Sequence, residues 1–183
     1  YLCLISVFLM SVNWGIETVK WKRLLQTATP NNELLKSIIA GITVGFVTPG
    51  RSGEFAGRVM FLNSDNGAKV FYLSSIGGLA QTAASLVIGV PFVFIWSNNI
   101  FITEIVTGCA VFYLLAFFRF DLLNRLLSMW SFLQQYGLLI KPADLPDINT
   151  QIEVLFLSAI RFCVYSLQYV LLLMFFGVTG NVP

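Results

Sequence analysis

Long apolar runs separated by short polar segments make up most of this chain, and the runs differ in length. A helix that spans a bilayer needs about 20 apolar residues, whereas a run of about 10 to 14 suggests a re-entrant or interfacial segment. The pattern therefore predicts four spans, the first of them truncated, one re-entrant segment and two interfacial amphipathic helices. Spans are expected at 1–12, 70–96, 100–118 and 152–176, the re-entrant segment at 37–62, and interfacial helices at 13–36 and 119–140.

The composition agrees with a membrane protein. Hydrophobic residues form 57% of the 183 positions and charged residues 11%, whereas soluble domains have about 25% charged residues. We therefore predict an all-α fold, a polytopic transmembrane helix bundle with a re-entrant, broken-helix hairpin. Because the sequence begins at Tyr1 inside an apolar run, we expect a single transmembrane domain that is part of a longer protein.

The distribution of basic residues distinguishes two ways of threading the chain through a membrane. If the run from Ser37 to Val47 enters and returns, nearly all basic residues lie on one side, and the loop from Ser97 to Asn99 on the other side has none. If this run spans instead, the basic residues are divided between the two sides. Since cytoplasmic loops carry an excess of Lys and Arg, the re-entrant arrangement is favoured, with the basic loops in the cytoplasm.

A charged, helix-breaking segment follows the short apolar run. Thr48 is expected to be the N-cap and Pro49 the first residue of a new half-helix. Arg51, Glu54 and Arg58 are spaced three and four residues apart and would share one face of it. A helix N-terminus beside an arginine predicts an anion site, for which phosphate is the natural ligand. Alternatively, Glu54 and Arg58 form an ordinary i,i+4 pair at a cytoplasmic turn.

Arg161 lies deep in the last apolar run. An arginine that faces lipid near the membrane centre costs roughly 2.5 to 3.5 kcal/mol, so Arg161 should face the bundle and have an anionic partner. The polar residues of this run share one helical face: Ser158, Arg161, Tyr165 and Gln168. In the alternative interpretation Arg161 only ties helices together. Its candidate partners are Glu17, Glu54 and Glu104.

Small residues mark two further faces. In the 70–96 run, small residues with one polar residue among them recur on one helical face and predict a helix–helix contact. Gln81 is the member most suited to face a cavity. The face consists of Ser74, Gly78, Gln81, Ser85 and Gly89. Gly41 and Gly45 form a GxxxG pattern that predicts close packing. Together these patterns predict a site for a lipid or anion, comprising Arg51, Glu54, Arg58, Gln81, Arg161 and Gln168.

Catalysis within this chain is not indicated. The sequence contains no histidine, the commonest general base and a frequent metal ligand, and it has no closely spaced acidic pair in the apolar segments. We therefore predict no catalytic residues, no metal site and no cofactor. A membrane lipid, and not a nucleic acid, is the expected partner.

Several of these residues, taken in order, resemble the lysylphosphatidylglycerol synthase transmembrane family of flippase-like bacterial membrane proteins. The most specific element is the string Thr48-Pro49-Gly50, Gly53-Glu54 and Arg58; weaker ones are Asn13-Trp14 with Glu17, Lys20-Trp21, Gly78 with Gln81, and Arg161 with Gln168. The resemblance implies a location in the bacterial inner membrane and functional importance for Glu54, Arg58, Gln81 and Arg161. It also implies translocation of a phospholipid, which in the best-known members is modified by an attached soluble domain.

Three functions are compatible with the sequence. The first is a flippase-like translocase of a phospholipid or a lipid-linked headgroup, with arginines binding phosphate. The second is the membrane part of an aminoacyl- or glycosyl-transferase system that acts on lipid headgroups. In the third, the chain is a non-catalytic scaffold whose charges only hold its helices together.

Overall fold

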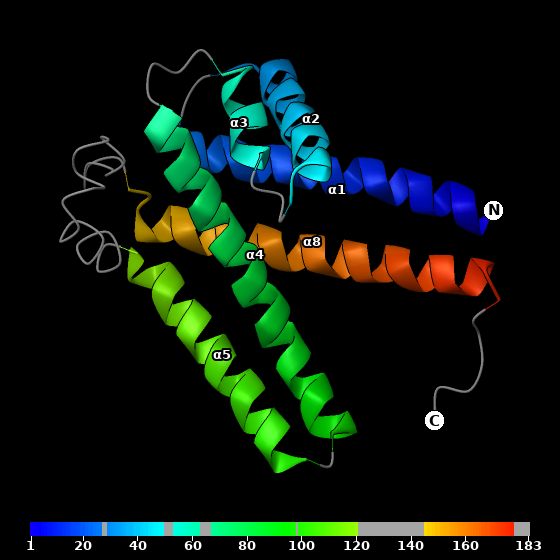
Figure 1. Cartoon of the computed structure of the whole chain (residues 1–183). Coiled ribbons are helices and arrows are strands. Elements are labelled where there is room, and N and C mark those ends of the chain that lie inside the picture. Colours follow the sequence, from blue (N-terminus) through cyan, green and yellow to red (C-terminus); the bar gives the residue numbers. More distant parts are fainter. Residues whose placement is uncertain (27–28, 50–52, 63–66, 98, 121–144, 178–183) are drawn as a thin grey trace.

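All secondary structure in the described part of the chain is helical. The structure is a computed structural model that describes residues 1–26, 29–49, 53–62, 67–97, 99–120 and 145–177. Its helices are α1 (Leu2–Leu25), α2 (Asn31–Val47), α3 (Glu54–Val59), α4 (Gly67–Trp96), α5 (Ile100–Phe118) and α8 (Ile148–Phe175), shown in Figure 1. The predicted all-α fold class is thus confirmed.

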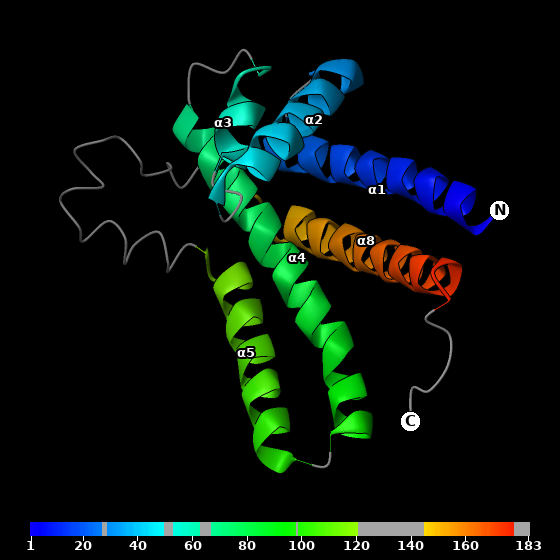
Figure 2. The same cartoon turned by 45° about the vertical axis from the view of Figure 1, so that its right-hand side comes forward.

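Four of the helices are long and apolar enough to cross a membrane, namely α1, α4, α5 and α8. They form two antiparallel pairs, α1 with α8 and α4 with α5, and α4 crosses α8 obliquely (Figures 1 and 2). Large apolar side chains cover their outer faces, as expected where lipid replaces water. The chain is therefore a multi-pass membrane protein.

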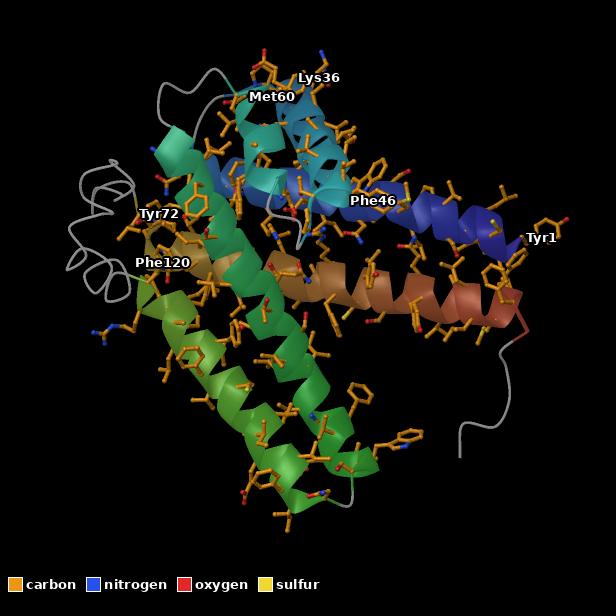
Figure 3. The ribbon with its side chains drawn as sticks, in the orientation of Figure 1. Tyr1, Lys36, Phe46, Met60, Tyr72 and Phe120 are labelled. Carbon is orange, nitrogen blue, oxygen red and sulfur yellow. The ribbon has the colours of Figure 1, made fainter. Side chains whose placement is uncertain are left out.

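The buried core lies at one end of the bundle, where the end of α1, the start of α4, the end of α5 and the start of α8 meet. Arg23 of α1 forms an ion pair with Glu153 of α8. The rings of Tyr72 and Phe120 pack edge to face, with their centroids 6.1 Å apart (Figure 3). Trp21 is fully buried in this core. α2 begins on the side of the bundle where α1 ends, and α3 ends on the side where α4 starts. Because successive spans alternate in direction, these two sides are the same.

Some helix boundaries differ from those expected. α1 is continuous from Leu2 to Leu25, so the division into a span at 1–12 and an interfacial helix at 13–36 has to be corrected. Two charged residues of the expected interfacial segment, Glu17 and Lys20, are instead buried against other helices. α5 matches the expected 100–118, whereas α4 and α8 each begin a few residues early. The helix expected at 119–140 lies mostly outside the described residues.

α2 and α3 form a tight antiparallel hairpin. α2 has 17 residues and is not among the four candidate spans. Its first turns are polar and carry the exposed Lys36, whereas its last turn presents Phe46, which is 92% exposed and points away from the bundle (Figure 3). A polar base and an apolar tip are typical of a segment that enters a bilayer without crossing it.

The break between α2 and α3 differs from the predicted one. Thr48 is the C-cap of α2, and Pro49 directly after it has 3₁₀-helical geometry. α3 begins only at Glu54 and has six residues. The Thr48 hydroxyl accepts a hydrogen bond from the backbone N–H of Gly53 at 2.9 Å, so it links the end of α2 to the residue that precedes α3. Arg51 lies outside the described residues, so the anion site expected beside it stays a prediction.

Glycines let the two helices of the hairpin touch. A Cβ atom at Gly57 would lie 2.5 Å from the backbone oxygen of Ala40, and one at Gly41 would lie 2.8 Å from the Arg58 side chain. A Cβ at Gly45 would meet Glu54 at 3.3 Å. The predicted packing role of Gly41 and Gly45 is confirmed, and the hairpin formed by this close approach places Arg58 against Glu17 of α1.

Gly57→Ala is expected to destabilise the protein by about 1 to 3 kcal/mol, the usual cost of overpacking, because the clash is with backbone that cannot rotate away. Gly108→Ala on α5 is the control, since its Cβ meets nothing within 4 Å and alanine is the better helix former by about 1 kcal/mol. Thermal unfolding in detergent would measure both variants. Equal stability of the two would show that the hairpin is not tightly packed.

Candidate functional site

The site is built around Glu17, a buried carboxylate on α1. Its side chain is 5% exposed and contacts cations from three helices. Lys20 Nζ on the same helix lies 2.8 Å from Oε2, Arg58 Nη2 of α3 lies 2.9 Å from Oε1, and Arg161 Nη1 of α8 lies 2.6 Å from Oε2. Glu17 therefore joins three elements that are far apart in sequence.

Helical spacing on α1 produces this arrangement. Asn13, Glu17, Lys20 and Trp21 recur at three- and four-residue steps, so they share the face that turns into the bundle. Asn13 accepts a hydrogen bond from Arg161 Nε at 2.6 Å, and Lys20 also donates to the backbone oxygen of Gly77 on α4 at 3.5 Å. One face of α1 thus holds the partners for α3, α4 and α8.

Arg58 is buried at the end of α3. Besides Glu17, it contacts Glu54 one turn earlier, with Nη2 2.6 Å from Oε1, and its guanidinium lies 4.8 Å from the centre of the Trp21 ring. Burial alone would lower the pKa of the Arg58 guanidinium, but the carboxylates of Glu17 and Glu54 outweigh it and raise this pKa. Arg58 is therefore charged at every physiological pH.

The charges of the cluster do not cancel. Lys20, Arg58 and Arg161 are three cations, and Glu17 and Glu54 are two carboxylates. The described part of the cluster therefore has one net positive charge. Three described cations share two carboxylates, so an anion that entered beside them would be attracted by the excess positive charge of the described residues.

A cavity of about 520 Å³ lies beside the cluster. It is lined by residues of α1, α3, α4 and α8: Asn13, Glu17, Lys20, Glu54, Phe55, Arg58, Ser74, Ser75, Gly77, Gly78, Gln81, Thr82, Ser85, Arg161, Phe162 and Tyr165. Tyr165 is 62% exposed, which shows that the cavity opens to the surroundings along α8. Of the three cations that contact Glu17, Arg161 has the most exposed side chain, at 22%.

Three buried polar atoms of the cavity lining have no hydrogen-bond partner within the described residues: Arg58 Nε, Ser74 Oγ and Gln81 Oε1. The amide nitrogen of Gln81 donates to the backbone oxygen of Ser158 at 3.4 Å, which orients the amide oxygen. Buried polar groups are normally paired. The cavity thus offers hydrogen-bond donors and an acceptor in addition to its charge.

The structure brings four of the six predicted site residues together, because Glu54, Arg58, Gln81 and Arg161 all line this cavity. Gln168 is two helical turns beyond Arg161 on α8 and does not line it. Arg51 lies outside the described residues. The anionic partner of Arg161, left open by the sequence, is Glu17.

One packing interpretation was only partly right and one group of residues was missed. Gln81 on the small-residue face of α4 contacts α8 through the Ser158 backbone oxygen. Gly78 and Gly89 of this face would meet nothing within 4 Å if given a Cβ, so they do not pack closely against another helix, and most of the face lines the cavity. Glu17 was only one of three candidate partners, and Lys20 was assigned to an interface. The signals that pointed to them were the three-residue spacing between them and their place among the weaker elements of the family resemblance.

Comparison with protein-family models, with curated proteins and with solved structures gives no match for this chain. The function is therefore inferred from the geometry of the site.

Proposed function

We propose that this protein translocates a membrane lipid by admitting its anionic headgroup into the cavity beside Glu17. The observation that carries the proposal is a polar cavity with net positive charge placed among helices that are long enough to span a bilayer. Arg161 and Arg58 would bind the phosphate of the headgroup, Ser74 would donate a hydrogen bond to it, and the amide oxygen of Gln81 would accept one from a donor group elsewhere on the headgroup. Glu54 would hold Arg58 in position through their ion pair.

The depth of the cavity supports this proposal. Arg161 lies in the middle of the 28-residue helix α8 and Gln81 in the middle of the 30-residue helix α4. At 1.5 Å per residue each is about 20 Å from either end of its helix. In a hydrocarbon layer about 30 Å thick, both would lie near the centre. Ionisable residues at this depth generally mark a pathway for a substrate or an ion.

The opening of the cavity suits a lipid better than a water-soluble ligand. Its aromatic edge, Phe162 and the exposed Tyr165, belongs to the apolar half of α8 that follows Arg161. In a membrane, acyl chains surround this part of the helix. A lipid could therefore keep its chains in the bilayer while its headgroup entered between α4 and α8.

The resemblance to the flippase-like family points in the same direction, since Glu54, Arg58, Gln81 and Arg161 are the residues for which it implied importance and all line the cavity. We further propose that the end of the bundle with the basic residues faces the cytoplasm of a bacterial cell. The excess of Lys and Arg at that end is typical of cytoplasmic loops.

Reconstitution in liposomes tests the proposal. The wild-type protein is expected to accelerate exchange of a labelled anionic phospholipid between leaflets, compared with protein-free liposomes. Arg58→Ala combined with Arg161→Ala should reduce this rate to the protein-free level, because both proposed phosphate ligands are lost. Circular dichroism must first show that the double variant is helical. Unchanged exchange in a folded double variant would overturn the assignment of the site.

A scaffold function is the second candidate. It is favoured by the close ion pairs of Glu17, which already pairs three cations within 3 Å. In that case the cluster only locks α1, α3 and α8 together, and the cavity takes no ligand. The two functions predict different rates of lipid translocation for a folded variant in which both Glu17 and Arg161 are replaced by neutral residues.

A further inference from the structure

We infer that Tyr165 and Gln168 form the second half of the path of the headgroup, along one face of α8 between the cavity and the far side of the membrane. This inference rests on the proposed function and goes beyond it, since it assigns a role to a polar residue outside the cavity and a direction to the movement. Gln168 does not line the cavity, and its side chain is half-buried.

This face of α8 changes from closed to open along the helix. Residues that recur at three- and four-residue steps share a helical face; here they are Val154, Ser158, Arg161, Tyr165 and Gln168. Val154 and Ser158 are fully buried, whereas Tyr165 is 62% exposed. The bundle core thus closes the first half of the face, and the face opens beyond Arg161, where α4 diverges from α8 (Figure 2).

The two polar side chains beyond Arg161 have no partner of their own. Neither the Tyr165 hydroxyl nor the Gln168 amide forms a hydrogen bond within the described residues. A polar group that faces hydrocarbon without a hydrogen bond is costly. A passing headgroup would supply the partners, because the phenol and the amide nitrogen can donate to phosphate oxygens and the amide oxygen can accept from the rest of the headgroup.

The positions of these side chains fit a headgroup that moves in short steps. At 1.5 Å per residue, Tyr165 lies about 6 Å and Gln168 about 10 Å beyond Arg161 along the helix axis. The pair between Arg23 and Glu153 places the start of α8 at the end of the bundle with the basic residues, so both steps lead towards the opposite surface. With Arg161 near the centre of a hydrocarbon layer about 30 Å thick, Gln168 lies close to its far edge.

α4 leaves room for the same movement. Past Gln81, its part of the cavity lining continues with Ser85, and Gly89 follows one turn later on the same face. A Cβ atom at Gly89 would meet nothing within 4 Å in the described part of the chain. The space beside this turn of α4 is therefore open.

The role of Gln168 is tested by exchange of a labelled anionic phospholipid between the leaflets of liposomes. Gln168→Leu is expected to lower the exchange rate roughly tenfold, since one hydrogen bond to the phosphate is lost. Binding of the same lipid in nanodiscs should keep the wild-type affinity, because the cavity is intact. Gln168→Asn, which keeps the amide, should recover part of the rate.

Ser166→Ala is the matched control. It removes a polar group from the same turn of α8, but two residues away and therefore on another face, so exchange should proceed at the wild-type rate. Wild-type exchange by Gln168→Leu would overturn the inference. Loss of binding together with exchange in Gln168→Leu would place this residue in the binding site and would also overturn it.

Cysteine labelling tests the path itself. The native residues Cys3, Cys109 and Cys163 are exposed and are first replaced by alanine. The probe is a phosphatidylethanolamine whose nitrogen carries a maleimide through an amide bond, which makes it an anionic phosphodiester with a thiol-reactive headgroup. Gln168→Cys should react with it, whereas Leu167→Cys, at nearly the same depth and exposed on another face, should stay unlabelled over the same time.

Equal labelling at the two positions would overturn the inference. Failure of the wild type to exchange the lipid at all would instead overturn the proposed function. Exchange that depends on Arg58 and Arg161 but not on Gln168 would overturn this inference and leave the proposed function in place.

Discussion

Glu17→Ala is expected to cause the largest loss of stability of any single substitution in the cluster, about 3 to 5 kcal/mol, the range found when one partner of a buried ion pair is removed. The physical reason is that Lys20, Arg58 and Arg161 would be left as neighbouring cations, with Glu54 as the one remaining carboxylate in the cluster described here. The midpoint of thermal or denaturant-induced unfolding in detergent measures the effect.

A second pair between the same two helices provides the control. Glu153 of α8 contacts Arg23 of α1 at 3.2 Å, but their side chains are 51% and 60% exposed. Exposed ion pairs contribute about 0 to 1 kcal/mol, so Glu153→Ala should have little effect. If Glu17→Ala were as mild as Glu153→Ala, the cluster would not hold α1, α3 and α8 together.

The double variant Glu17→Gln with Arg161→Met is expected to fold and yet to lose most lipid translocation. Replacing both partners of a buried pair is often neutral or stabilising, and the glutamine oxygen can still accept from Lys20 and Arg58. The phosphate, however, would lose the hydrogen bonds and charge of Arg161. Charge-assisted bonds contribute about 1.5 to 3 kcal/mol, so we expect a decrease in exchange rate of roughly 10- to 100-fold.

This variant distinguishes the two proposed functions. If the cluster only locks the helices, a stable double variant should behave like the wild type in every assay. Arg161→Lys is a useful companion, because lysine keeps the charge but cannot form the two parallel bonds of a guanidinium. Full translocation by a stable Glu17→Gln, Arg161→Met protein would favour the scaffold and remove Arg161 from the site.

Much of the candidate site could be predicted because charges are rare in an apolar chain. Arg161 stood out because an arginine cannot face lipid cheaply, and the structure indeed buries it against Glu17. Glu17 and Lys20 were harder to find, because a charged segment near tryptophans has the composition of a membrane interface. Only the packing of α3, α4 and α8 against α1 shows that these two side chains are buried.

The broken hairpin illustrates the same limit at the level of local structure. Thr48 followed by Pro49 has the composition of a helix start, and in the structure Thr48 also caps the end of α2 and bonds to Gly53, so that the next α-helix begins only at Glu54. The reason is tertiary: Gly41, Gly45 and Gly57 allow α3 to lie directly on α2. This contact requires a sharp reversal before the next helix can begin.

The sequence by itself determined that the protein is an all-α membrane protein with four candidate spans and one short broken hairpin. These properties follow from the length and polarity of single segments, which the bilayer selects independently of their neighbours. Only the tertiary structure decided that Arg161 pairs with Glu17, that the small residues of α4 line a cavity and that three cations share two carboxylates. Such properties depend on distances between helices, and a list of residue spacings along one helix contains no information about them.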